Sequence, residues 1–125
     1  MSNVELGRHA ETIASSFLKL NGYSVIARNY RYRRNELDIV AQRDDCLVLV
    51  EVKYRSGPGR GLPREAVGRQ KMRGIIRAAR GYLAEHGLRS TRVRFDVIEV
   101  RLEAGGSGLA VRHIVGAFGA DYRGW

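Results

Sequence analysis

The most apolar segment of the chain ends in two charged residues. Leucine and valine fill positions 47–50, and Glu51, Val52 and Lys53 follow directly. Side chains two residues apart on a β-strand face the same way, so Glu51 and Lys53 are expected to share one side of a strand. Asp38 lies in the preceding apolar segment. These three charged residues are candidates for a site of metal-assisted hydrolysis.

The distance between Asp38 and Glu51 depends on the turn that joins their two segments. The acidic pair at 44–45 is a turn signal, and a two-residue turn there would pair Arg43 with Cys46. Continuing that register sets Asp38 directly opposite Glu51. A four-residue turn would keep the two carboxylates on one face, whereas a three-residue turn would separate them.

A cation between the two carboxylates would relieve their repulsion. Opposed side chains have Cβ atoms about 4.5–5.5 Å apart, and two charges at that distance repel by roughly 3 kcal/mol at an effective dielectric of about 20. Mg²⁺ binds one or two carboxylates, keeps several waters and accepts a phosphate oxygen. Lys53 would point to the same place, where it can steady a metal-bound water or offset charge on a phosphate. Glu11 is a further candidate, near the border of the apolar stripe of a predicted helix.

A purely structural interpretation of the same residues is also open. Glu51 and Lys53 can be charges at the end of a strand, with Lys53 paired across the hairpin to Glu36. Glu11 can be an ordinary glutamate at the rim of its helix. Residue spacing alone does not decide between the two interpretations. Asp96, which has apolar neighbours on both sides, is interpreted as structural.

The charge balance favours a polyanionic partner. The 125 residues include 22 Lys and Arg against 13 Asp and Glu, which gives a net charge of +9. Nucleic acid is the first candidate partner, although a basic surface can also serve solubility alone. The single cysteine, Cys46, excludes an internal disulfide. No apolar stretch approaches the ~20 residues that span a bilayer, and no secretory signal opens the chain, so we expect a cytoplasmic protein without membrane contact.

Two basic segments are candidates for nucleic-acid binding. The first, residues 28–34, places two tyrosines among four arginines, so that phosphates can be held while a base stacks on a ring. The second is a predicted helix with arginines every three or four residues, which can grip phosphates. The residues assigned to nucleic-acid binding are Arg31, Tyr32, Arg33, Arg34, Arg73 and Arg77. The structural alternatives are core tyrosines and a solvated helix face.

The elements that must position these residues alternate between helices and strands. Apolar periodicity predicts helices at about 2–22 and 68–86. It predicts strands at about 23–31, 35–42, 46–54, 91–101 and 109–118. A loop is expected at 55–63, which holds both prolines. The order α-β-β-β-α-β-β predicts an α/β fold with a mixed central sheet flanked by helices, as one domain over residues 1–125.

These motifs resemble those of a known nuclease superfamily. An acidic residue one hairpin upstream of E-x-K is the pattern of the PD-(D/E)xK superfamily, with its restriction-endonuclease-like fold. Residues 7–55 more closely resemble the uncharacterised bacterial YraN family, as do the segments RFDVIEV and HIVGAF near the C-terminus. The layout is also similar to that of archaeal Holliday junction resolvases. Leu37 stands where the superfamily usually has the proline.

The resemblance implies a metal-dependent nuclease that hydrolyses phosphodiester bonds in DNA, with branched or structured DNA as the sharper expectation. The residues to which it assigns catalytic roles are Asp38, Glu51, Lys53 and Glu11. Asp38 and Glu51 would be the ligands of Mg²⁺ or Mn²⁺. Gln70 and Lys71 open the second helix, where some members carry a further active-site residue. The alternative is a nucleic-acid-binding module on the same fold with little or no catalysis. The sequence does not distinguish RNA from DNA as the partner, or a homodimer from a monomer.

Overall fold

Two helices and five strands make up the described part of the chain. A computed structural model describes residues 2–56, 68–88, 91–102 and 108–118, apart from the side chains of Asn3, Ser56 and Leu102. In chain order the elements are α1 (Asn3–Leu20), β1 (Ser24–Tyr32), β2 (Asn35–Arg43), β3 (Cys46–Ser56), α2 (Arg69–Glu85), β4 (Arg92–Leu102) and β5 (Leu109–Phe118). Of the loop predicted at 55–63, residues 57–63 lie outside the described part. Neither α1 nor α2 has the length and apolar content that a helix needs to cross a bilayer.

The strands form one mixed sheet in the order β1-β2-β3-β4-β5. Neighbouring strands are antiparallel except β3 and β4, which run parallel. A parallel pair needs a long crossover, and α2 lies in that connection. The predicted α/β class, with its mixed sheet and its order α-β-β-β-α-β-β, is confirmed. The predicted pairing of Arg43 with Cys46 is also confirmed.

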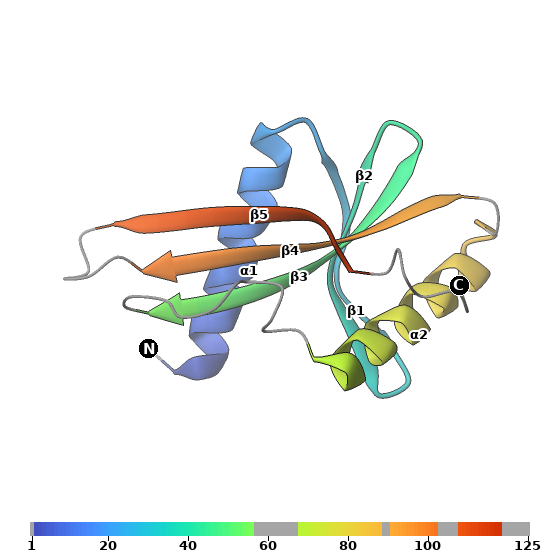
Figure 1. Ribbon diagram of the computed structural model, residues 1–125, viewed down its shortest axis with the longest axis horizontal. Coiled ribbons are helices and arrows are strands. Elements are labelled where there is room, and N and C mark those ends of the chain that lie inside the picture. The colour runs from blue at the N-terminus through green and yellow to red at the C-terminus, as the bar shows by residue number, and fades with distance from the viewer. Residues whose placement is uncertain (1, 57–67, 89–90, 103–107, 119–125) are drawn as a thin grey trace.

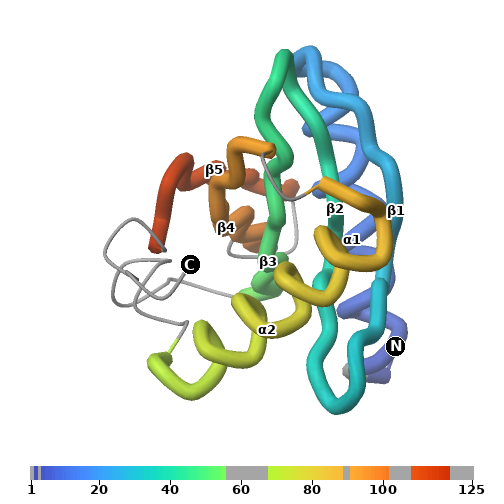
Figure 2. Tube along the Cα trace, turned by 90° about the vertical axis from the view of Figure 1, so that its right-hand side faces the viewer, coloured from blue at the N-terminus to red at the C-terminus, as the bar shows by residue number. Residues whose placement is uncertain are grey.

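The two helices cover opposite faces of the sheet. Val40 and Leu49 belong to the core cluster that contains residues of α2, whereas Ala41 and Val48 belong to the cluster that contains residues of α1. Neighbouring strand residues point to opposite faces, so each helix packs on its own side. Figure 1 shows α1 passing behind the strands, and Figure 2 shows α2 crossing in front of β2. The continuous apolar run at 47–50 is therefore buried from both sides.

Local signals set the two ends of α1. Ser2 is the N-cap, and its Oγ accepts a hydrogen bond from the Glu5 backbone N–H at 3.1 Å. After the C-cap, Gly22 adopts a φ of 87°, a left-handed conformation that suits glycine. Both ends agree with the prediction. These caps define the two ends of α1, and Glu11 lies midway along it.

Glycines allow α2 to approach the β1–β2 hairpin closely. A Cβ built on Gly81 would lie 2.2 Å from the ring of Tyr32, and one on Gly74 would lie 2.5 Å from Asn35 Oδ1. A larger side chain would clash with the Tyr32 ring at position 81 and with the end of the Asn35 side chain at position 74. The apolar stripe predicted for this helix is buried or half-buried: Met72, Ile75, Ile76, Ala79, Tyr82 and Leu83.

Asp96 has the structural role that was predicted for it. The residue is fully buried on β4, and its carboxylate accepts hydrogen bonds from Arg94, His113 and the Gly116 backbone N–H. Burial alone would raise the pKa of Asp96, but the bonds from His113 and Arg94 bring it below its ordinary value. A buried charge that is paired on every side holds β4 and β5 together.

We expect Gly81→Ala to destabilise the protein although alanine is the better helix former. Alanine is favoured over glycine by about 1 kcal/mol in a helix, but overpacking against the Tyr32 ring costs about 1–3 kcal/mol. Gly7→Ala is the matched control, because a Cβ there meets nothing within 4 Å, and it should raise stability. Urea denaturation compares both variants with the parent. A Gly81→Ala protein as stable as Gly7→Ala would contradict the close approach of α2.

Candidate functional site

β2 and β3 separate at the position of Asp38. The backbone pairing between these strands ends at Ile39 and Val50, although β3 continues to Ser56. Asp38 and Glu51 would be the next pair, so they are neighbours without being ladder partners. Instead, the Val52 backbone N–H donates a hydrogen bond to Asp38 Oδ2 at 2.8 Å. A side-chain carboxylate thus replaces a backbone carbonyl, and an opening forms between the strands.

The alternation of β2 also breaks at Asp38. Leu37 belongs to the core beneath α2, whereas Ile39, two residues on, belongs to the core beneath α1. In the neighbouring strand, Asn29 has a φ of 54°, and it lies between the residues that pair with Ile39 and Leu37. Both strands are therefore irregular at the same level. The irregularity turns the Asp38 carboxylate out of the regular ladder.

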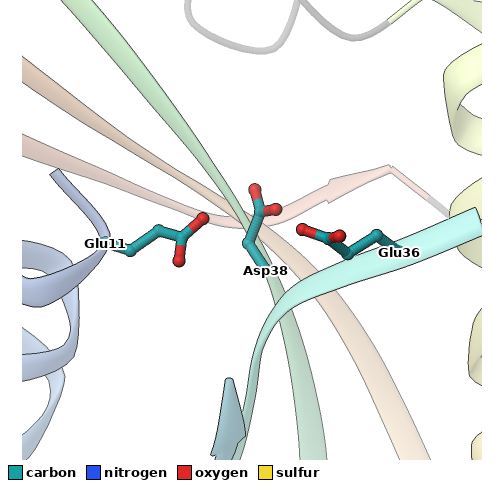
Figure 3. A group of neighbouring side chains, drawn as sticks. All are labelled: Glu11, Glu36 and Asp38. Atoms are coloured by element: carbon teal, nitrogen blue, oxygen red, sulfur yellow. The ribbon is translucent and has the colours of Figure 1, made fainter. Parts of the chain in front are cut away.

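Three carboxylates meet at this irregularity. Glu11 of α1 and Glu36 and Asp38 of β2 each have a carboxylate oxygen within 4.8 Å of the others. Figure 3 shows Asp38 between the other two, with all three side chains directed at a common space. Glu11, a predicted site residue, faces this cluster. Glu36 was predicted only as a partner of Lys53; its signal was its position two residues before Asp38, on a strand.

The charges in this cluster are not fully balanced. Burial, followed by repulsion from Glu51, raises the pKa of Asp38 from 3.8 to about 7. Burial and the nearby Asp38 likewise raise the pKa of Glu11. Glu11 Oε1 is buried and has no hydrogen-bond partner among the described residues, and Arg28 Nη2 lies 3.9 Å from it. Glu36 is paired with Arg31 at 3.2 Å. The surroundings therefore oppose the simultaneous ionisation of Asp38 and Glu11.

Glu51 is paired with two lysines and is not a member of the three-carboxylate cluster. Its side chain is 4% exposed, and its Oε1 lies 3.6 Å from Lys53 Nζ and 3.5 Å from Lys71 Nζ. The predicted proximity of Glu51 and Lys53 is thus observed. Lys71 was noted at the start of the second helix but was not assigned to the site. Its participation depends on how α2 docks, which no spacing within the helix reveals.

Cavities open on both sides of the cluster. A cavity of about 820 Å³ is lined by Asp38 and Glu36, by the first turn of α2 and by basic residues. Those basic residues are Arg31, Arg34, Arg69 and Lys71. A second cavity, of about 450 Å³, is lined by Glu11, Glu36, Asn29, Arg8 and Arg31 among others. Arg31 and Glu36 line both cavities, so the carboxylates lie between two openings that have basic residues at their edges.

The residues predicted to bind nucleic acid are divided between this site and the outer surface. Arg31 and Arg34 line the larger cavity. Arg73 and Arg77 are exposed on the outward face of α2. Arg33 is exposed and lies 5.2 Å from the centre of the Tyr32 ring, which is half-buried against Gly81. Stacking of a base on Tyr32 stays a prediction.

The raised pKa of Asp38 predicts how stability depends on pH. A carboxyl group with a pKa of about 7 when folded and 3.8 when unfolded stabilises the fold at low pH, and this contribution is lost as the pH rises through 7. Asp38→Asn should therefore be more stable than the parent at about pH 8, by at most about 4 kcal/mol, and the difference should shrink towards pH 4.

Urea denaturation in EDTA across this pH range measures the difference. Asp45→Asn, in the exposed turn between β2 and β3, controls for the loss of one negative charge. An Asp38→Asn protein that is less stable than the parent at pH 8 would contradict the predicted cost of ionising Asp38 and would indicate a structural role for this residue.

Sequence comparison places the chain among known relatives. It matches the family described as "Uncharacterised protein family UPF0102" over residues 10–100. A UPF0102 protein of Syntrophotalea carbinolica is 47% identical over 122 residues, which cover 98% of this chain and 96% of the relative. A UPF0102 protein of Prosthecochloris aestuarii is 44% identical over 121 residues, covering 94% and 95%. One of Desulforapulum autotrophicum is 52% identical over 95 residues, covering 76% and 78%. The chain therefore belongs to UPF0102, the uncharacterised YraN family that its own residues 7–55 predicted.

Proposed function

We propose that this protein is a metal-dependent nuclease that hydrolyses phosphodiester bonds in DNA, with branched or structured DNA as its preferred substrate. The observation that carries the proposal is the convergence of Glu11, Glu36 and Asp38, with their unbalanced charge, at the opening between β2 and β3. Membership of UPF0102 is consistent with the PD-(D/E)xK superfamily, in which acidic residues of this kind serve catalysis.

The donor set fits Mg²⁺ or Mn²⁺. All three groups offer carboxylate oxygens, which these ions prefer. Glu11 Oε1 is a buried acceptor to which no residue in the described part of the chain donates a hydrogen bond, so a cation would satisfy it. Glu11, Glu36 and Asp38 would hold the ion, with Glu51 close by. When bound, such an ion lowers the pKa of a water ligand and polarises a phosphoryl oxygen.

The chain's own residues supply position and charge. Asp38 is fixed by the hydrogen bond from the Val52 N–H, so its free oxygen keeps one direction. Lys53 is anchored by Glu51, at 3.6 Å, and its ammonium can stabilise negative charge that develops on the phosphate. Arg31, held by Glu36, borders both cavities and can orient the substrate backbone beside the carboxylates.

The charge of the molecule supports a nucleic-acid substrate. The net charge is +9, and the cavity beside Asp38 has arginines at its edge. A phosphodiester is anionic and is repelled by carboxylates, so neighbouring cations must attract it to an acidic cluster. The rival function is a binding module without catalysis, which would use the basic residues but would not need the carboxylates.

A cleavage assay separates these two functions. Purified protein should cleave DNA with Mg²⁺ or Mn²⁺ and not with EDTA, on at least one of duplex, single-stranded and four-way substrates. Asp38→Asn should abolish cleavage because a metal ligand is lost, yet bind DNA without metal as well as the parent or slightly better. Asp45→Asn should keep both activities. Metal-independent binding without cleavage of any DNA or RNA substrate would leave the binding module as the function.

Phosphate contacts predict a steep dependence of DNA binding on salt. Each contact releases counterions, so affinity falls as ionic strength rises. Reversing charge with Arg73→Glu and Arg77→Glu should weaken binding and lower the slope of log affinity against log salt by about 1 per lost contact. Arg92→Glu is the control, because it changes the net charge by the same amount as each of the other variants. Arg92 is an exposed residue of β4 that pairs with Asp45. Equal slopes for all three variants would remove Arg73 and Arg77 from the binding surface.

A further inference from the structure

We propose that Lys71 couples nucleic-acid binding to metal binding. While its ammonium group is paired with Glu51, that carboxylate is withheld from the cation; a substrate phosphate that binds Lys71 releases Glu51 to complete the metal site. The inference rests on the proposed function, because it concerns the regulation of that same site.

The first observation is the state of Glu51. This buried carboxylate has two ammonium groups within 3.6 Å of one oxygen, from β3 and from α2. It lies close enough to raise the pKa of Asp38 but is not a member of the group formed by Glu11, Glu36 and Asp38. Two positive charges on Glu51 compete with a divalent cation for the same acceptor.

The second observation distinguishes the two lysines. The Lys71 side chain is 50% exposed and lines the 820 Å³ cavity, whereas Lys53 is 28% exposed and is not among the residues that line it. Arg34 and Arg69 line the same cavity, and the first turn of α2 contains no acidic residue. An incoming phosphate therefore meets Lys71 before Lys53, and Lys71, Arg34 and Arg69 offset the Asp38 and Glu36 carboxylates that line the same cavity.

The consequence is a positive linkage between the two ligands. A phosphate and Glu51 compete for Lys71, and Lys71 and the cation compete for Glu51. Each ligand thus removes the competitor of the other. Because linkage is reciprocal, DNA should tighten metal binding by the same factor by which metal tightens DNA binding.

Mn²⁺ binding with and without DNA tests the inference. Free Mn²⁺ is measured by electron paramagnetic resonance, with a short phosphorothioate DNA duplex that keeps its charge and resists cleavage. DNA should tighten Mn²⁺ binding to the parent by about 5- to 150-fold, the usual range of such coupling. Lys71→Met should bind Mn²⁺ more tightly than the parent without DNA, and DNA should add little.

Two variants control for charge and folding. Arg92→Met removes one positive charge at an exposed residue of β4 that lines neither cavity beside the carboxylates, and should keep the coupling. Lys71→Arg retains the charge and should also keep it. Asp38→Asn with DNA gives the background of Mn²⁺ bound by the DNA itself.

The outcomes separate the inference from the proposed function. Parent-like Mn²⁺ affinity and parent-like coupling in Lys71→Met would overturn the inference and leave the nuclease proposal standing. The same holds for weaker Mn²⁺ binding in Lys71→Met, or for a parent whose Mn²⁺ affinity DNA does not change. A parent that binds no Mn²⁺ with or without DNA would overturn the metal site itself, and the coupling with it.

Discussion

The hydrogen bond from the Val52 amide to Asp38 Oδ2 is the constraint on which the site depends. It satisfies a backbone donor that loses its strand partner where β2 and β3 separate, so the sheet can open there without leaving a buried N–H unpaired. The same bond holds a carboxylate in the opening, beside Glu11 from α1 and opposite the lysines of β3 and α2. This one hydrogen bond therefore both completes the backbone hydrogen bonding of the sheet and positions a carboxylate of the site, so a change to it affects both.

Buried carboxylates elsewhere in the molecule show what distinguishes this site. Asp96 is fully buried but accepts bonds from a guanidinium, an imidazole and an amide, and Glu99 is paired with Arg55 at 2.9 Å and Arg101 at 2.7 Å. These groups are compensated by residues of the chain itself. Asp38 and Glu11 are compensated only in part, by the Val52 N–H and by Arg28, and burial with repulsion still raises their pKa values. Incompletely compensated charge in a cavity is typical of sites that bind an external cation.

The fold was predictable because its signals are local. Apolar periodicity and the turn signal at 44–45 each act within a few residues, and each element lies where these signals predict. The site was predictable only in part. Asp38, Glu51 and Lys53 lie in a recognisable pattern, and Glu36 lies two residues before Asp38 on the same strand. The convergence of Glu11 on these carboxylates and the contact of Lys71 with Glu51 depend on how α1 and α2 dock. Docking arises from tertiary packing, which a single sequence does not display.

The glycine at position 74 allows α2 to lie close to the β1–β2 hairpin beside the site. It lies one turn after Lys71, at the point where α2 touches Asn35, and it has no side chain to separate the helix from the hairpin. The height of α2 above the sheet determines whether an ammonium on its first turn can reach Glu51, which is 3.5 Å away. An added methyl group in this contact would displace either the Asn35 side chain or the helix, and a shift of the helix would change the reach of Lys71 while every charged residue stayed the same. The contact between Lys71 and Glu51 thus depends partly on Gly74, a residue that contacts neither metal nor substrate.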